Sequence, residues 1–266
     1  MTRSRPFSTR IPVVLGIPAL FGIAFLVIPL LGLLVRAPWG SLITHLHEPG
    51  VWEALRLSLL CATLATLVSV AFGVPLAWAL ARSEIPGRAL IRALVTVPLV
   101  LPPVVGGVAL LLVLGRRGLV GQWLDQWFGI SLPFSTTAVV LAESFVAMPF
   151  LVLSVEGALR GADRRYDEAA ATLGASSWLT FRRVTLPLVA PGVAAGAVLA
   201  WARALGEFGA TITFAGNFPG TTQTMPLAVY VALETSPDAA IVLSLLLLAV
   251  SVGVLVALRH RWVPTA

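Results

Sequence analysis

Six apolar runs dominate this chain of 266 residues, and each is close to the length that a helix needs to cross a lipid bilayer. A crossing helix takes about 20 residues, because the hydrocarbon layer is about 30 Å thick and each helical residue rises about 1.5 Å. The runs therefore predict an all-α polytopic membrane protein with a single transmembrane domain over 1–266. They lie at about 11–35, 54–81, 90–114, 137–155, 188–205 and 239–258.

The first run follows a basic stretch, as the apolar core of a secretory signal does. It is about 25 residues long, whereas the apolar core of a cleaved signal has about 7–15 residues. We therefore expect 11–35 to remain in the protein as its first membrane span. With five further runs, the chain is expected to be a multi-pass protein of the cell membrane, surrounded by lipid.

Charge is scarce in this sequence and is carried by an unusual set of residues. Charged residues make up 11% of the chain, whereas soluble domains carry about a quarter. All 18 basic residues are arginine. The lack of lysine excludes a standard P-loop ATPase, whose lysine reaches the bound phosphates. The single cysteine, Cys61, excludes a disulfide within the chain.

The arginines are distributed unevenly between the two sides of the membrane. With the N-terminus inside, 13 arginines fall on the cytoplasmic side of the six spans and five on the outer side. Cytoplasmic flanks collect basic residues, so this arrangement predicts both termini in the cytoplasm and places 160–187 there. The same bias explains the net charge of +6, and nucleic acid is not an expected partner.

The third run contains PLVLPPVVGG at 98–107, with three prolines and two adjacent glycines. Each proline removes a backbone donor and clashes with the preceding turn, so the helix should bend or open here. Irregular backbone inside a bilayer must be buried in protein or line a cavity, and broken helices in transporters often mark the substrate path. Pro98, Pro102 and Pro103 are therefore candidates for a translocation path, with a packing kink as the alternative.

Small residues recur at every fourth position of the fifth run, at Gly192, Gly196, Ala200 and Ala204. Such a face lets two helices approach closely in lipid. It indicates either a central pathway or subunit interface, which makes Gly192 and Gly196 candidates for the path, or packing within the chain. Pro191 suits the first turn of this helix.

Charged residues at membrane depth are few. Arg203 and Glu207 are four residues apart, so they can pair on one helical face. Buried charge is costly and often functional; we expect a neutralised structural pair, and the alternative is that Arg203 assists an anion along the path. Glu143 is expected within the fourth span.

No set of residues typical of catalysis is found in the sequence. There is no His-x-x-x-His, no Gly-x-Ser-x-Gly and no cysteine cluster, so we expect no enzyme activity, cofactor or metal site. His45 and His47 are two residues apart in an outer loop, which is a weak indication of a metal site. The apolar piece 225–233 in the longest outer loop predicts a short helix.

The stretch DEAAATLGASSWLTFRRVTLP, residues 167–187, stands out from the apolar runs around it. Acids at its start favour a helix N-terminus, Gly174 is placed to end that helix, and Ser176 or Ser177 can cap a second one. The second helix would expose Trp178, Leu179 and Phe181 outside the membrane and end near Arg182 and Arg183. Such a face fits a groove on a partner protein, or rests on lipid headgroups.

This stretch resembles the EAA motif of ABC importer permeases, which reads Glu-Ala-Ala, three residues, Gly, nine residues, Ile-x-Leu-Pro. Val184 stands where isoleucine is usual. The resemblance implies a coupling segment over 160–187, including Trp178, that sits in a cleft of the ATPase subunit. It also implies a type I importer fold with two permease copies, two ATPase copies and an external oxyanion-binding protein. The matching residues are Glu168, Ala169, Ala170, Gly174, Leu186 and Pro187.

Three further stretches, 98–107, 114–121 and 202–230, resemble the permeases of molybdate importers. The likeness covers nearly all of the chain beyond the first run, and Met225 stands where a leucine is common. It implies a non-catalytic transmembrane subunit that imports a tetrahedral oxyanion at the expense of ATP hydrolysed by its partner. Molybdate is the expected cargo, sulfate or tungstate are the alternatives, and a secondary transporter is the competing class.

Overall fold

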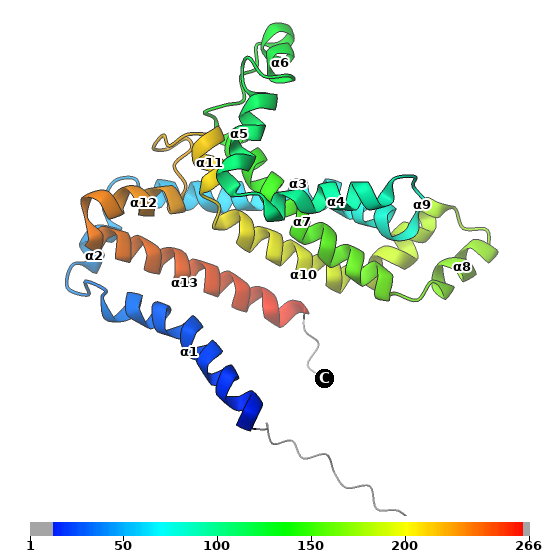
Figure 1. Cartoon of the computed structure of the whole chain (residues 1–266), viewed down its shortest axis with the longest axis horizontal. Helices are drawn as coiled ribbons and strands as arrows, with labels where there is room; N and C mark the ends of the chain where they lie inside the picture. The colour runs from blue at the N-terminus through cyan, green and yellow to red at the C-terminus, as the bar shows by residue number, and fades with distance from the viewer. Residues whose placement is uncertain (1–12, 263–266) are drawn as a thin grey trace, which may run out of the picture.

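A computed structural model describes residues 13–262 of the chain, and within them all regular structure is helical (Figure 1). The basic residues Arg3, Arg5 and Arg10, and the predicted start of the first run, lie outside the described residues. The helices are α1 Val13–Val35, α2 Leu42–Leu46, α3 Val51–Arg82, α4 Arg88–Val100, α5 Pro103–Leu114, α6 Gly121–Phe128, α7 Thr136–Gly161, α8 Arg165–Thr172, α9 Ser177–Thr180, α10 Leu186–Leu205, α11 Gly209–Phe214, α12 Met225–Thr235 and α13 Pro237–Trp262.

Five helical segments are long and apolar enough to cross a bilayer: α1, α3, α7, the continuous helix Ser177–Leu205 and α13. The predicted third span is divided into α4 and α5, which meet at an angle of 117°. The all-α polytopic fold is therefore confirmed. Six spans are reached when this bent pair is counted as one.

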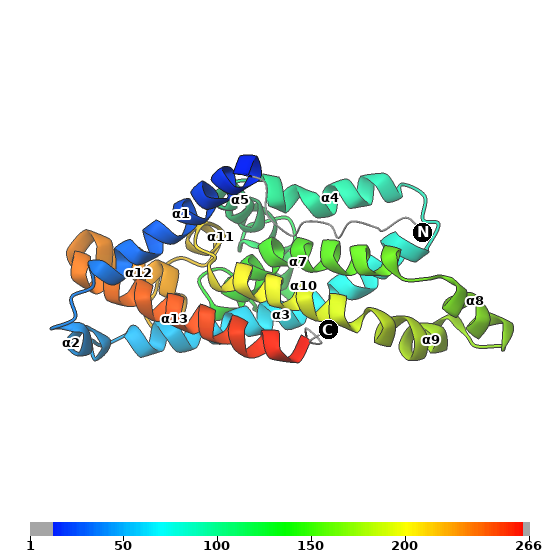
Figure 2. The ribbon, with the colours of Figure 1, turned by 90° about the horizontal axis from the view of Figure 1, so that it is seen from below.

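The centre of the fold is a bundle of α3, α7 and α10, which lie side by side (Figures 1 and 2). Lipid gives helices no hydrophobic reason to associate, so close packing between small residues holds them together. The contacts are accordingly rich in fully buried alanines. These are Ala62, Ala65, Ala77, Ala147, Ala200 and Ala204.

The small-residue face of α10 packs against α7 of the same chain. A β-carbon added at Gly192 would lie 2.3 Å from the Cβ of Ala158, and one added at Gly196 would lie 3.0 Å from the Cβ of Ser154. The hydroxyl of Ser154 also donates a hydrogen bond of 3.1 Å to the carbonyl of Gly192. The regular spacing of these residues therefore serves contact within the chain.

The expectation that Pro191 lies in the first turn of the fifth-span helix is wrong. A π-helical turn over Phe181–Thr185 joins α9 to α10, so Pro191 lies inside a continuous helix and Pro187 occupies the first turn of α10. In the wider turn the N–H of Leu186 bonds to the carbonyl of Phe181, five residues earlier. This spacing lets the helix continue up to a proline that has no N–H to donate.

The outer elements of the fold differ in how well they are packed. Most large apolar side chains of helix α1 are exposed, Leu33 is partly buried, and the helix contacts α13 (Figure 1). Helix α12 confirms the short helix predicted over 225–233 and is anchored firmly. Met225 and Leu227 are fully buried, and the N–H of Met225 donates a 2.7 Å hydrogen bond to the hydroxyl of Ser58.

The contact at Gly192 leads to a stability prediction. Gly192→Ala forces α10 away from α7, and overpacking of this kind costs about 1–3 kcal/mol. The matched control is Gly157→Ala on α7, where an added β-carbon meets nothing within 4 Å. Because Cys61 is buried and is the one cysteine of the chain, a thiol-reactive dye reports unfolding. The unfolding midpoint should fall for Gly192→Ala alone; equal midpoints would contradict the tight contact.

Candidate functional site

The 160–187 segment projects from one end of the bundle. Helices α8 and α9 lie there, and α2 and α12 lie at the opposite end (Figures 1 and 2). This separation agrees with the sequence-based expectation that the segment and the outer loops face opposite sides of a membrane. It makes the segment available to a molecule that approaches from its own side.

Gly174 ends α8 as predicted. Its φ of 81° lies in the left-handed region that favours glycine. The N–H of Gly174 bonds to the carbonyl of Ala171 at 2.9 Å, and the N–H of Ala175 bonds to that of Ala170 at 3.0 Å. This pair of bonds is the Schellman motif, which satisfies the last carbonyls of a helix.

Ser176 begins the second short helix, also as predicted. Its hydroxyl accepts a hydrogen bond of 3.3 Å from the N–H of Leu179, which caps α9. The expectation that Arg182 and Arg183 sit near the end of this helix is wrong, because the chain continues through the π-helical turn into α10. The segment is therefore joined to a membrane helix without a break.

Polar contacts hold the 160–187 segment to the end of α3. The carboxylate of Asp167 accepts a 2.8 Å hydrogen bond from the hydroxyl of Thr185 and lies 3.6 Å from Nε of Arg82. Arg82 also donates to the carbonyl of Ala162, and Arg164 donates to the carbonyl of Ala81, both at 3.2 Å. These bonds fix α8 relative to α3.

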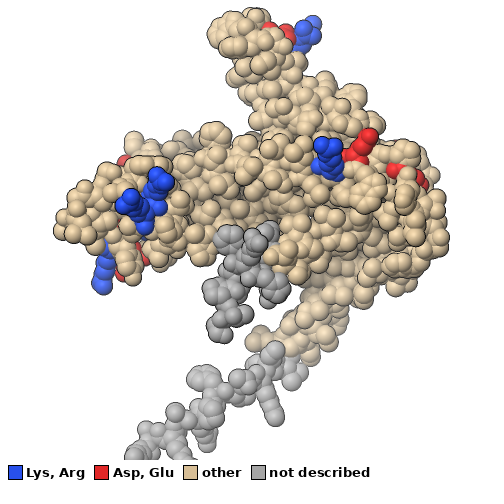
Figure 3. Space-filling model, turned by 180° about the vertical axis from the view of Figure 1, so that it is seen from behind, with Lys and Arg blue, Asp and Glu red and all other residues tan. Residues whose placement is uncertain are grey.

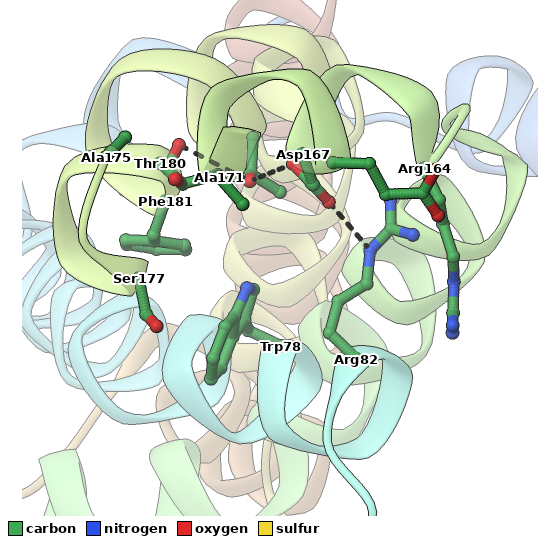
Figure 4. A pocket seen from close by; sticks show the side chains of 11 residues that line it. Trp78, Arg82, Arg164, Asp167, Ala171, Ala175, Ser177, Thr180 and Phe181 are labelled. Carbon is green, nitrogen blue, oxygen red and sulfur yellow. Dashed lines mark hydrogen bonds and ion pairs between the residues drawn. The ribbon is translucent and has the colours of Figure 1, made fainter. Parts of the chain in front are cut away.

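A cavity of about 310 Å³ opens between α3 and the segment. Figure 4 shows Arg82 reaching from α3 to Asp167 on one side, with Trp78 facing Phe181 on the other. The rings of Trp78 and Phe181 meet edge to face with centroids 6.0 Å apart, and Trp178 stacks on Phe181 at 5.8 Å. The three rings brace α9 against the bundle.

Large apolar side chains remain exposed on the outer surface of the segment. Leu173 is 88% exposed and Trp178 is 67% exposed, with Tyr166 close behind. Exposed aromatic and aliphatic groups of this size typify a contact surface. The sequence predicted Trp178 and Leu179 here. It did not identify Leu173 or Tyr166, and Phe181 is half-buried rather than exposed.

The motif residues divide into those on the surface and those that support it. Glu168 and Ala169 are exposed, and Ala170 supplies the carbonyl that closes the Schellman turn. Leu186 and Pro187 form the first turn of α10, directly after the π-helical turn. The six motif residues therefore lie in one continuous stretch that follows α7 and runs into the first turn of α10.

The proline-rich stretch produces the predicted break. Pro98 lies inside α4, the backbone turns extended at Leu101 and Pro102, and Pro103 begins α5. The displaced α5 packs against α11 through two glycines. A β-carbon at Gly107 would lie 2.8 Å from the carbonyl of Ala210, and one at Gly209 would lie 2.9 Å from the Cβ of Pro103.

Arg203 and Glu207 form the predicted pair, with Nη1 and Oε2 2.7 Å apart. The second oxygen of Glu207 accepts a 2.8 Å hydrogen bond from the N–H of Ala210, in the first turn of α11. Glu207 is almost fully buried, so the pair neutralises a buried carboxylate and satisfies a backbone donor at once. Glu143 is buried in α7, as expected for a residue of the fourth span.

A comparison with protein families identifies the type of membrane protein. A family profile described as "Binding-protein-dependent transport system inner membrane component" matches residues 69–263, which is more than half of the chain. The chain belongs to this family of inner membrane transport components. Family membership agrees with several apolar membrane-spanning helices and makes the chain a multi-pass inner membrane protein.

Several transport permeases are similar to this chain along most of their length. The molybdenum transport system permease protein ModB of Mycobacterium tuberculosis is 49% identical over 95% of this chain and 96% of its own. ModB of Escherichia coli K12 is 44% identical over 79% of this chain and 92% of its own. The sulfate transport system permease protein CysT of Escherichia coli K12 is 36% identical over 83% and 80%.

Solved structures share the fold of this family member. A chain of a bacterial ABC transporter for the import of alginate has a TM-score of 0.74 at 17% identity, covering 93% of both chains. A chain of the inward-facing methionine transporter MetNI has a TM-score of 0.58 at 20% identity, covering 88% of this chain and 96% of its own. The fold is therefore that of type I ABC importer permeases.

The contacts of Arg82 lead to a prediction about local stability. Arg82→Gln removes the ion pair to Asp167, so α8 should open more readily. Amide exchange across 165–175 should quicken about fivefold, for a loss of about 1 kcal/mol. Arg165→Gln is the matched control, since the Arg165 side chain makes no hydrogen bond or ion pair with any described residue. Exchange measured by mass spectrometry that rises equally in both variants would argue against the contact.

Proposed function

We propose that this inner membrane component is the permease subunit of an ATP-driven ABC importer that carries molybdate into the cytoplasm. The observation that carries the proposal is the ranking of relatives. Identity is 49% and 44% with two permeases named for molybdenum transport, and 36% with one named for sulfate transport. Sulfate or tungstate remains the alternative cargo, because both are tetrahedral oxyanions like molybdate.

The proposed complex contains two copies of this chain, two copies of an ATPase and an external oxyanion-binding protein. The family description, a binding-protein-dependent transport system, supports the external partner. The lack of lysine, and with it of a P-loop, supports a separate ATPase. In this complex the chain performs no chemistry of its own, and both of its termini lie in the cytoplasm with the 160–187 segment.

In the proposed mechanism the exposed surface of the segment sits in a groove of the ATPase. Leu173 and Trp178 supply the apolar contact, and Glu168 supplies a charge at the rim. Exclusion of water from such aromatic contacts is what makes them dominate binding. When ATP closes the two ATPase copies, the segment moves with its groove, and the joined α10 moves with the segment.

The path for the anion is proposed to run beside the broken helix and α10. Pro98, Pro102 and Pro103 bend the backbone where an open passage is needed. Gly192 and Gly196 contribute by holding α10 against α7.

Arg203 and Glu207 lie at the far end of α10 from the 160–187 segment. Because Glu207 neutralises Arg203, the passage offers no strong anion site, and a weak site favours release into the cytoplasm.

Cargo is tested by uptake of radiolabelled molybdate in cells that lack this chain and in cells that regain it. Uptake should require the chain. A tenfold excess of tungstate should compete and a tenfold excess of sulfate should not. If sulfate competes as well as unlabelled molybdate does, the molybdate assignment is wrong and a sulfate importer replaces it.

Coupling is tested by recovery of the ATPase after extraction in mild detergent. Glu168→Arg and Gly174→Asp should each reduce recovery about tenfold, equivalent to about 1.4 kcal/mol, because one reverses a rim charge and the other strains the left-handed turn. Gly40→Asp is the control, at an exposed glycine outside the 160–187 segment with open space around it. Unchanged recovery in both variants, or transport by the chain alone under a proton gradient, would contradict the ABC assignment.

A further inference from the structure

Helix α6 stands apart from the rest of the molecule. Figure 1 shows it at the tip of an arm formed by α5, to the side of the bundle rather than over either end. The arm leaves the bundle because of the 117° bend between α4 and α5. Beside a membrane-spanning bundle the immediate neighbours are the surrounding lipid and a second copy of the chain, whereas the proposed external binding protein would approach the outer end of the bundle.

The arm is stiff, so the position of α6 is set by the fold. The loop 115–120 folds back on the end of α5, with the N–H groups of Leu119 and Val120 bonded to the carbonyls of Leu112 and Val113 at 3.1 and 2.8 Å. A β-carbon at Gly121 would lie only 2.0 Å from the carbonyl oxygen of Gly115. The glycine at 121 therefore permits a close contact that no side chain would allow.

The eight residues of α6, GQWLDQWF, separate cleanly around the helix axis. At about 100° per residue, the two tryptophans, Leu124 and Phe128 fall within one arc of about 140°, and the polar residues fall outside it. The apolar arc is uncovered: Trp127 is 70% exposed and Phe128 is 67% exposed. The rings of Trp123 and Trp127 lie 5.3 Å apart.

The polar side of α6 carries a charged hollow. Arg116 pairs with Asp125 at 3.0 Å, and Arg117 forms no ion pair with any described residue. Figure 3 shows charged atoms at the tip of the arm, set apart from the other charged groups on this face. The hollow has a volume of about 300 Å³ and is lined by Arg116, Arg117, Gln122, Asp125 and Gln126.

We infer that α6 is an interfacial anchor that binds phospholipid headgroups beside the transporter. Indole rings prefer the boundary between hydrocarbon and water, where the ring is buried and its N–H stays hydrated. A short helix with aromatic residues on one face and arginine beside the other lies in that boundary. A headgroup phosphate matches Arg117, and the ammonium of an ethanolamine headgroup matches Asp125.

A second copy of the chain fits these observations less well. A second copy could cover the apolar arc, but a single phospholipid supplies an acyl chain for that arc and a phosphate for Arg117 together. The inference rests on the proposed function in one respect. The proposed topology puts α6 on the membrane face opposite the 160–187 segment, and therefore in the outer leaflet.

The first test uses the transporter complex in vesicles of phosphatidylethanolamine and phosphatidylglycerol whose acyl chains carry bromine near the headgroup. The difference in fluorescence between the wild type and W123F/W127F reports on Trp123 and Trp127. Brominated lipid should quench this difference at least twofold. If that fluorescence is quenched by acrylamide in water and not by brominated lipid, the inference is overturned. It is overturned equally if W127C, in a C61S background, forms disulfide-linked dimers, since the apolar arc would then face a second copy.

The second test counts retained phosphatidylglycerol by native mass spectrometry. R116Q/R117Q should lose at least one bound lipid, and R36Q/R56Q, two exposed arginines away from both the hollow and the 160–187 segment, should lose none. Equal loss in both variants would overturn the charged hollow as a lipid site. ATPase recovery is measured on the same samples, and normal recovery shows that the variants are folded. If the lipid-anchor inference is wrong, the proposed importer function is unaffected. If the importer proposal is wrong, no ATPase is recovered even with the wild type.

Discussion

The backbone of a membrane protein must satisfy its own hydrogen bonds, because hydrocarbon offers no partner for an N–H or a carbonyl. Several irregular features of this structure satisfy or cover backbone groups that would otherwise lack a partner. The π-helical turn before Pro187 gives the N–H of Leu186 an acceptor five residues back. Glu207 accepts the N–H of Ala210 where α11 starts inside the fold. The break at Pro102 is closed by α11 packing against α5.

Small residues solve the second physical problem, which is adhesion between helices in lipid. The bundle of α3, α7 and α10 is joined through alanines and glycines rather than through bulky side chains. Dispersion forces weaken steeply with distance, so backbones that nearly touch gain most from them. Charge is used where the bundle meets water: Glu156 is buried between Arg92 at 2.5 Å and Arg160 at 2.7 Å, tying α4 to α7.

Much of this arrangement could be predicted from the sequence, because membrane spans depend on length and polarity alone. The bend at 98–107, the turn at Gly174 and the pairing of Arg203 with Glu207 are all encoded within a few residues. The continuation of the helix from α10 back to Ser177 was missed because a π-helical turn has no compositional signature, and Pro191 has the appearance of a first-turn residue.

Long-range contacts were the other part that the sequence could not supply. Nothing in the run 54–81 indicates that Trp78 packs on Phe181, about a hundred positions later. Arg82 was counted only as a topological charge, and its contact with Asp167 depends on how α3 and α8 meet. The 117° angle at the broken helix likewise follows from packing against α11, while the prolines specify only that the helix ends.

The unbroken helix from Ser177 to Leu205 has a mechanical consequence. Its 29 residues make a rod about 43 Å long at about 1.5 Å per residue. A rotation of about 10° around its midpoint would displace each end by about 4 Å in opposite directions, close to the rise of one helical turn of about 5.4 Å. One end carries Trp178, and the other carries Arg203 beside α11. If the helix pivots at its glycine contacts with α7, a displacement of its end at one membrane face moves its other end in the opposite direction.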